Sequence, residues 1–290
     1  MIRTVGIVGG GTMGQGIAIA CAAASLDVLL RERTHKLGQD ALDGMAEELD
    51  RDIAKWRRTE SEKKAILARV RIVESLEALE AAEIVVEAVP EDLELKASIF
   101  QELDRVCPPD DILATNTSTL SVTEIATRTH RRDRVIGLHF LHPVPKVPLV
   151  EVVRGLSTSD STYRTALEFV RVLGKTGIEV FEYPGYVTTR VMLPFLNEAM
   201  HVVMEGVASA EAVDTSMKLG YQLPIGPLAL ADRMGLDEVM RWMQYLFDEL
   251  GDIKYRPCPL LRKMIRAGHL GVKSGRGFFE YDEEGNPRTS

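Results

Sequence analysis

The sequence has few cysteines and no long apolar run, and both absences limit what the protein can be. Cys21, Cys107 and Cys258 are odd in number, far apart and outside any CxxC pair, so they indicate neither a disulfide framework nor a zinc site. The N-terminal stretch lacks the apolar core of a signal peptide, and no segment approaches membrane-spanning length. We therefore expect a protein of the reducing cytoplasm, without a membrane partner.

Positive charge is scarce as well. The chain has 35 lysines and arginines against 43 acidic side chains, which gives a net charge of -8 at pH 7. Binding of nucleic acid needs clustered basic residues, so we expect no nucleic-acid partner, whereas a small anion needs only a local basic patch. With 290 residues, 45% of them apolar and 27% charged, the chain has a soluble globular composition and a length that favours two domains.

Short apolar segments alternate with helical patterns along the first part of the chain. Strands are predicted at 5–8, 27–32, 83–89, 111–118, 134–140, 148–153 and 178–183, with helices between them that include one long polar helix over 36–68. Repeated strand–helix units predict an α/β fold, a Rossmann-type doubly wound parallel sheet with its ligands at one edge. Helical periodicity over 186–206 and 209–250 follows Pro184 and Gly185. We predict a Rossmann-type domain at 1–183 and an all-helical domain at 184–290.

A glycine-rich segment, GIVGGGTMGQG, follows the first predicted strand and begins a helix. Gly9, Gly11 and Gly14 form a GxGxxG motif, with Thr12 and Met13 between its second and third glycines. In this position the glycines provide a tight turn, a close backbone approach to a pyrophosphate, and close packing of helix on strand. The helix N-terminus offers N–H groups to the phosphates, so we predict a dinucleotide site made by these five residues.

Such a motif also predicts an acidic residue at the end of the second strand, and Glu32 is found there. Its carboxylate is placed to accept hydrogen bonds from a ribose diol; the alternative is an ordinary surface charge. Arg31 and Arg33 flank it and are compatible with a 2′-phosphate, but the carboxylate would repel that group. NAD is therefore expected in preference to NADP.

The segment HFLHPVPKVPLVEVV places His139 at the end of a predicted strand and Glu151 alone among apolar residues. Prolines 143, 145 and 148 between them favour a rigid loop that returns the chain. A buried carboxylate needs a partner, and an imidazole held at one nitrogen can exchange a proton at the other. We predict a proton-handling pair; a structural ion pair or a solvent-facing edge glutamate is the alternative.

The ordered motifs GIVGGGTMGQGIA, VEAVPEDLELK, ATNTSTLSV, GLHFLHPVPKVPLVEVV, PIGPLALADRMGLD and GHLGVKSGRGFFEY run through nearly the whole chain. Together they resemble the short-chain L-3-hydroxyacyl-CoA dehydrogenase family, near its 3-hydroxybutyryl-CoA dehydrogenase members. The resemblance implies reversible oxidation of a 3-hydroxyacyl-CoA with NAD, by a dimer that pairs through its helical domain. It also implies His139 as the base, Glu151 as the carboxylate that orients it, and Ser118 as a contact of the reacting oxygen.

The same resemblance implies further cofactor contacts at Glu91, Lys96, Asn116 and Lys273. Several of these residues have plain structural alternatives. Ser118 can cap a turn or helix, and Lys273 can belong to a glycine-rich turn. Glu91 can be a solvated charge at a helix start, and Lys96 an exposed helix lysine.

Two positions depart from the family pattern. His142 and Thr189 stand where the family usually has asparagine, at positions expected to bind substrate or hold catalytic groups. Both side chains still form hydrogen bonds, with a different reach. His139 and His142 have no third partner for a metal, so we predict no metal site.

A cluster of basic residues over the long polar helix is the candidate patch for the phosphates of CoA, with a solvated helix face as the alternative. The patch comprises Arg51, Lys55, Arg57, Arg58, Lys63 and Lys64. Two other functions stay open. Relatives that oxidise free hydroxy acids such as gulonate or carnitine share the glycine motif, and some proteins of the family have become non-catalytic.

Overall fold

A computed structural model describes residues 2–288 of the chain and divides it into two compact units, Met1–Tyr186 and Val187–Ser290. The first unit is built on one sheet of eight strands in the order β3-β2-β1-β4-β5-β6-β7-β8. The strands are β1 (Thr4–Val8), β2 (Asp27–Arg31), β3 (Val70–Val73), β4 (Ile84–Glu87), β5 (Ile112–Thr115), β6 (Val135–Phe140), β7 (Leu149–Arg154) and β8 (Thr176–Phe181). The first six are parallel and follow the 3-2-1-4-5-6 order of a dinucleotide-binding fold.

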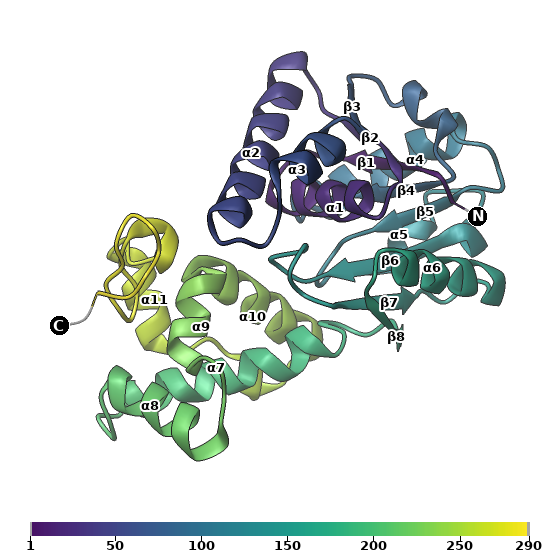
Figure 1. Ribbon diagram of the computed structural model, residues 1–290. Coiled ribbons are helices and arrows are strands. Elements are labelled where there is room, and N and C mark those ends of the chain that lie inside the picture. Colours follow the sequence, from purple (N-terminus) through teal and green to yellow (C-terminus); the bar gives the residue numbers. More distant parts are fainter. Residues whose placement is uncertain (1, 289–290) are drawn as a thin grey trace. The chain divides into compact units, whose positions relative to one another are not determined.

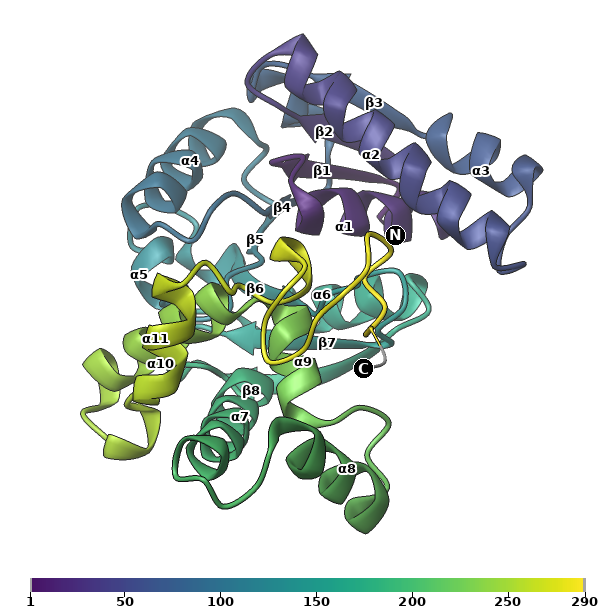
Figure 2. The ribbon, with the colours of Figure 1, turned by 90° about the vertical axis from the view of Figure 1, so that its left-hand side faces the viewer.

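Helices cover both faces of this sheet (Figures 1 and 2). They are α1 (Thr12–Ala23), α2 (His35–Ala54), α3 (Glu60–Leu67), η1 (Glu77–Ala81), α4 (Leu93–Val106), α5 (Val122–Ala126), η2 (Arg132–Arg134) and α6 (Asp160–Val172). One core joins α1, α2, α3 and α6 to the sheet, and the other joins η1, α4 and α5 to its opposite face. The central strands are buried on both faces, which explains why their sequences are continuous apolar runs rather than alternating ones.

The predicted doubly wound parallel sheet is confirmed, and two of its features add to the prediction. β7 is antiparallel to β6, and β8 continues from β7 in parallel. A short return through three prolines suits an antiparallel pair, because a parallel neighbour needs a long crossover. β3, with the sequence VRIV, was not expected. It is a short edge strand with a charged residue at its second position, so it lacks the apolar run of the central strands.

The prediction of a single helix over 36–68 is also wrong. The helix ends at Ala54, and Trp56 takes a left-handed backbone conformation with φ 54° that cannot continue it. Thr59 then begins α3 with a capping box, in which its side chain binds the amide of Glu62 and the Glu62 side chain binds the amide of Thr59. The pattern T-x-x-E at 59–62 is the signal that could have placed this break.

The second unit is helical, as expected. Its elements are α7 (Thr188–Met204), α8 (Ala210–Tyr221), α9 (Pro227–Met234), α10 (Leu236–Leu250), η3 (Ile253–Tyr255), α11 (Pro259–Arg266) and η4 (Val272–Ser274). Three helices therefore occupy the stretch 209–250 that was expected to be one helical region. Buried Asp214 starts α9 by accepting hydrogen bonds from the amides of Leu228 and Ala229. No helix within residues 2–288 is long and apolar enough to cross a bilayer.

Candidate active site

The six parallel strands β1 to β6 all end at one edge of the sheet. From β1 the chain builds the sheet outward in one direction through β2 and β3. It then returns to the other side of β1 with β4 and continues in the opposite direction, so the strand order reverses between β1 and β4. This switch point is where ligands bind in open α/β sheets. The glycine turn follows β1, Glu32 follows β2, Glu91 follows β4, Ser118 follows β5, and His139 lies near the end of β6.

The glycine turn has the geometry that a pyrophosphate requires. Gly9 has a φ of 103°, and a Cβ on Gly14 would lie 1.8 Å from the carbonyl oxygen of Gly9. Gly11 is exposed with open space above it, and no side chain caps the N-terminus of α1, where Thr12 and Met13 begin the helix. Uncapped helix N–H groups at the surface attract an anion, so the residues present fit a dinucleotide.

Glu32 holds the same turn from the end of β2. One carboxylate oxygen accepts a hydrogen bond from the amide of Gly10 at 2.5 Å, and the other accepts from the amide of Arg33 at 3.1 Å. The carboxylate is therefore fixed beside the glycine turn, with lone pairs left for a further donor.

His139 and Glu151 lie directly opposite each other on β6 and β7. Nδ1 of His139 and Oε2 of Glu151 are 2.5 Å apart, and the side chains are 4% and 0% exposed. The ring of Tyr186 is tilted against the imidazole at a centroid distance of 5.6 Å. The expected return of the chain is thus present, and the alternative of a solvent-facing glutamate is excluded. An imidazole held at Nδ1 keeps Nε2 for proton exchange.

Asn116 aligns the two central strands of the site. Its side-chain oxygen accepts a hydrogen bond from the amide of Phe140 at 2.9 Å, next to His139. The backbone amide of Asn116 donates to the backbone carbonyl of Glu87 at 2.8 Å. Asn116 therefore joins the ends of β4, β5 and β6.

Lys96 is not the exposed helix lysine that its alternative interpretation required. Its side chain is 1% exposed, and its ammonium lies 2.7 Å from Oε1 of Glu87 and 3.3 Å from Oε2 of Glu91. Thr115 also donates to Glu87, at 2.7 Å. Burial raises the pKa of Glu87, and Lys96 and the hydrogen bonds only partly oppose this. The sequence reading missed Glu87; the signal was a charge at the end of the apolar segment EIVVEAV.

Glu91 connects this buried cluster to the segment after β5. Its Oε1 accepts hydrogen bonds from the amides of Ser118 and Thr119 at 2.9 and 3.1 Å, and from the hydroxyl of Thr117 at 2.5 Å. Burial acts to raise the pKa of Glu91, but Lys96 and these bonds outweigh it and hold the pKa below its usual value. The backbone of Ser118 is fixed while its hydroxyl makes no hydrogen bond within residues 2–288. Its hydroxyl is thus available to a ligand.

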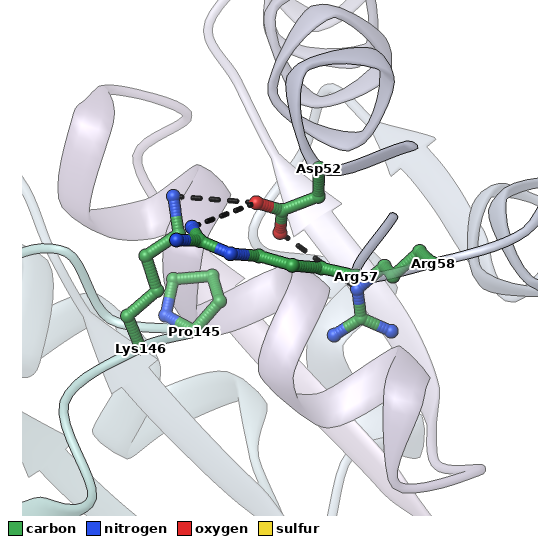
Figure 3. A pocket seen from close by; sticks show the side chains of 5 residues that line it. All are labelled: Asp52, Arg57, Arg58, Pro145 and Lys146. Carbon is green, nitrogen blue, oxygen red and sulfur yellow. Dashed lines mark ion pairs between the residues drawn. The ribbon is translucent and has the colours of Figure 1, made fainter. Parts of the chain in front are cut away.

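A pocket of about 460 Å³ lies beside the loop that joins β6 to β7. Figure 3 shows buried Asp52 among three cations, with ion-pair distances of 3.7 Å to Arg57, 4.0 Å to Arg58 and 3.3 Å to Lys146. Three positive charges around one carboxylate leave the pocket basic, which suits an anionic group.

Only part of the expected basic patch lines this pocket. Lys63 is instead paired with Asp50 at 2.5 Å, and Lys55 is exposed at the end of α2. His142 lies on the loop itself with part of its surface open to solvent; desolvation of the ring lowers its pKa from the usual value, with Glu48 opposing and Lys146 adding to the shift.

Two expected site residues belong to the second unit. Thr189 is half-buried in the first turn of α7. Lys273 lies in η4 and its ammonium donates to Asp237 at 2.7 Å. Within residues 2–288 no group of three or more metal-ligating side chains is assembled.

Comparisons with known proteins cover nearly the whole chain. Residues 4–183 match the model of the 3-hydroxyacyl-CoA dehydrogenase NAD-binding domain, and residues 185–281 match that of the 3-hydroxyacyl-CoA dehydrogenase C-terminal domain. A probable 3-hydroxybutyryl-CoA dehydrogenase of Bacillus subtilis is 48% identical, over 98% of this chain and 99% of that protein. A 3-hydroxybutyryl-CoA dehydrogenase of Bradyrhizobium diazoefficiens is 43% identical over 97% and 96%.

A solved structure agrees with these relatives. The crystal structure of (S)-3-hydroxybutyryl-CoA dehydrogenase PaaH1 from Ralstonia eutropha superimposes with a TM-score of 0.91 and 46% identity. The superposition includes 98% of this chain and 100% of the Ralstonia eutropha chain.

Proposed function

The chain belongs to the 3-hydroxyacyl-CoA dehydrogenase family, and from this membership we propose that it interconverts short-chain (S)-3-hydroxyacyl-CoA and 3-ketoacyl-CoA. It is an NAD(H)-dependent oxidoreductase. The observation that supports the chemistry best is the buried His139–Glu151 pair, 2.5 Å apart at the ligand-binding edge of the sheet.

In this proposal Nε2 of His139 takes the proton from the 3-hydroxyl group of the substrate. Bound NAD supplies the chemistry of hydride acceptance from C3. Glu151 fixes the orientation of the imidazole and stabilises the imidazolium, since a buried cation needs a charge partner. The hydroxyl of Ser118 donates to the same substrate oxygen and polarises it in the reducing direction.

Gly9, Gly11, Thr12, Met13 and Gly14 hold the pyrophosphate of the cofactor in this proposal. Glu32 accepts from the ribose diol and disfavours the 2′-phosphate of NADP by repulsion. The remaining predicted cofactor contacts are Glu91, Lys96, Asn116 and Lys273, and for the first three the contacts described above support a role at the edge where the cofactor binds.

The basic pocket gives the phosphates of CoA a place on this acidic protein. We propose that Arg57, Arg58 and Lys146 bind them, with Lys55 nearby along the chain and with His142 and Thr189 as acyl-side contacts. Lys146→Met is expected to raise the KM for an acyl-CoA by about fivefold to tenfold, because a partly exposed charge contact is worth about 1 kcal/mol. Arg69→Glu, an exposed arginine paired with Asp27, is the control and is expected to leave that KM unchanged.

Residues 1–183 act as the cofactor domain and residues 184–290 as the pairing domain of a cytoplasmic homodimer in this proposal. Supporting it, the second unit leaves apolar side chains exposed on α8 and after α7, at Val207, Leu219 and Tyr221. Light scattering coupled to gel filtration is expected to give twice the chain mass, and a monomer would contradict the pairing.

The function is tested by following NADH and then NADPH oxidation with acetoacetyl-CoA and with free acetoacetate. Rapid NADH oxidation with the CoA ester, and slow turnover with both NADPH and the free acid, is the expected result. Turnover of a free hydroxy or keto acid in preference to its CoA ester would move the protein to the free-acid branch. NADH binding without turnover of any of these substrates would favour a non-catalytic role.

A further inference from the structure

Lys175 is a buried lysine without a carboxylate partner. It directly precedes β8 and is 8% exposed. Its ammonium donates to the carbonyl oxygens of Val144 and Val147 at 2.6 and 2.7 Å, and it forms no ion pair within residues 2–288. Burial lowers its pKa, with a small opposing effect from Cys21. A buried cation held only by carbonyls is costly, so its two hydrogen bonds fix the loop at a cost in stability.

The two carbonyls belong to residues 141–148, the loop between His139 on β6 and Glu151 on β7. The amide of Thr176 supports the same loop by donating to the carbonyl of Pro148 at 2.7 Å. On the opposite side the loop lies against α1, where a Cβ on Gly16 would be 2.9 Å from the Cβ of Val144. The loop is therefore clamped between β8 and the helix that begins at the glycine turn.

The same loop carries Lys146 to the basic pocket. Lys146 lies between the two residues whose carbonyls Lys175 binds, and its own ammonium is 3.3 Å from Asp52. The amides of Lys146 and Val147 also donate to the carbonyl of Pro143, at 3.0 Å each, and form the turn itself. Releasing the carbonyls of Val144 and Val147 would leave that turn but remove its anchor to the residue before β8. The strands that carry His139 and Glu151 are held by their own ladder and do not depend on these two bonds.

We propose that Lys175 is a positioning residue that sets the reach of Lys146 toward the phosphates of the acyl-CoA substrate. It acts on substrate affinity through the loop and does not touch the reacting atoms. The inference rests on the proposed function and on the assignment of Lys146 to the phosphate pocket.

Arg131 offers a control at the other end of the sheet, where it also pairs with the Asp104 carboxylate at 2.8 Å, a type of partner that Lys175 lacks. It is also a buried cation, and its guanidinium donates to the carbonyls of Asp104 and Cys107 at 2.9 and 2.7 Å. The carbonyls that it binds lie at the end of α4, before β5 begins, and away from the ligand-binding edge. Lys175→Met and Arg131→Met therefore both remove a cation that holds carbonyls, and only the first affects the loop with Lys146.

The experiment measures Tm, kcat and KM for acetoacetyl-CoA and NADH in the wild type, Lys175→Met, Lys175→Arg, Arg131→Met, Lys146→Met and the double variant Lys175→Met/Lys146→Met. We expect Lys175→Met to raise the KM for acetoacetyl-CoA about fivefold, since about 1 kcal/mol of a charge contact is lost. The KM for NADH should stay within about twofold of the wild-type value. Lys175→Arg should keep the KM for acetoacetyl-CoA close to that of the wild type, because arginine retains donors for both carbonyls. The double variant should show no larger KM than Lys146→Met alone, since both changes remove one contact. Arg131→Met should lower Tm and leave every KM unchanged.

Three results would overturn the proposal: a lower Tm in Lys175→Met with an unchanged KM, multiplicative effects in the double variant, or the same kinetic pattern in Arg131→Met. If Lys175→Met does not fold, Lys175→Gln, which keeps one or two donors without charge, replaces it in every comparison. Failure of all three Lys175 variants to fold would assign the residue a structural role alone. A wild type that does not reduce acetoacetyl-CoA would refute the proposed function itself, which distinguishes the two failures.

Discussion

Two histidine–carboxylate pairs lie at opposite ends of β6, and they differ in burial and in their distance from the ligand-binding edge. His139 and Glu151 meet at 2.5 Å where β6 ends, both of them buried. His130 and Asp104 meet at 2.8 Å before β6 begins, and the His130 side chain is 100% exposed. Each end also has a buried cation bound to carbonyls, Lys175 at the first and Arg131 at the second.

The difference shows that position in the fold decides what such a pair does. Asp104 accepts from the backbone amide of His130 and from Nε of Arg131 at 2.8 Å each, so it fastens the turn before β6 to the end of α4. Glu151 faces a ring whose other nitrogen is at the switch-point edge. The His130–Asp104 pair is architectural, whereas in the proposed function the His139–Glu151 pair handles a proton.

The largest effect is expected from removing the imidazole at the ligand-binding edge. His139→Ala should lower kcat for acetoacetyl-CoA reduction by about 10³-fold, because general acid–base catalysis contributes about 10² to 10⁴. His130→Ala should leave kcat unchanged, because its fully exposed side chain lies before β6 and away from the ligand-binding edge. Steady-state NADH oxidation measures both, and equal losses in the two variants would remove the distinction between the pairs.

Replacing the carboxylate of the His139–Glu151 pair should lower kcat less than replacing the imidazole. Glu151→Gln keeps the shape of the side chain but removes the charge that stabilises the imidazolium, so we expect kcat to fall about 10²-fold. Its Tm should change little by comparison. An unchanged kcat in Glu151→Gln, measured at saturating substrate, would mean that His139 works without it.

Asp104 should show its effect in stability alone. Burial acts to raise its pKa, but the amide of His130 and Arg131 outweigh burial and lower the pKa below its usual value. A lowered pKa in the folded state means that the stabilisation is present above the usual pKa and is lost as the pH falls through the folded value. Asp104→Asn should therefore cost about 2 kcal/mol between pH 5 and 8, with the difference from wild type shrinking below about pH 4. Urea unfolding across pH measures this, and a difference that grows in acid would contradict it.

The smallest catalytic effect is expected at Glu91, which acts by holding the backbone of Ser118. Glu91→Gln keeps one acceptor oxygen but weakens its grip on the two amides, so kcat should fall about tenfold through misplacement of the hydroxyl. Glu94→Gln, in the first turn of the α4 helix that follows Glu91, is the control and should retain full activity, because Glu94 is exposed and paired with Arg128. A loss of Tm without any loss of kcat would show that Glu91 is structural only.

The ligand-binding edge of the sheet could be predicted from the sequence, because several buried apolar strands end in glycine, asparagine, serine or histidine. Parallel strands bring their C-terminal ends to the same edge, so these residues are expected to lie together there. The return of the chain from His139 to Glu151 followed from three prolines and one isolated charge. The buried roles of Glu87 and Lys175 were not predicted, because burial depends on packing between segments far apart in the chain. The contact of Lys175, next to β8, with the 141–148 loop is an example. The break at Trp56 was missed because polar helix-forming residues continue on both sides of it.

The most direct test of the account is a double-mutant cycle on the pair itself, with kcat/KM for acetoacetyl-CoA measured in the wild type, His139→Gln, Glu151→Gln and the double variant. If Glu151 acts only through the imidazole, the account predicts that Glu151→Gln has no further effect once His139 is replaced. Independent, multiplicative losses would contradict the claim that the two buried side chains work as one proton-handling unit.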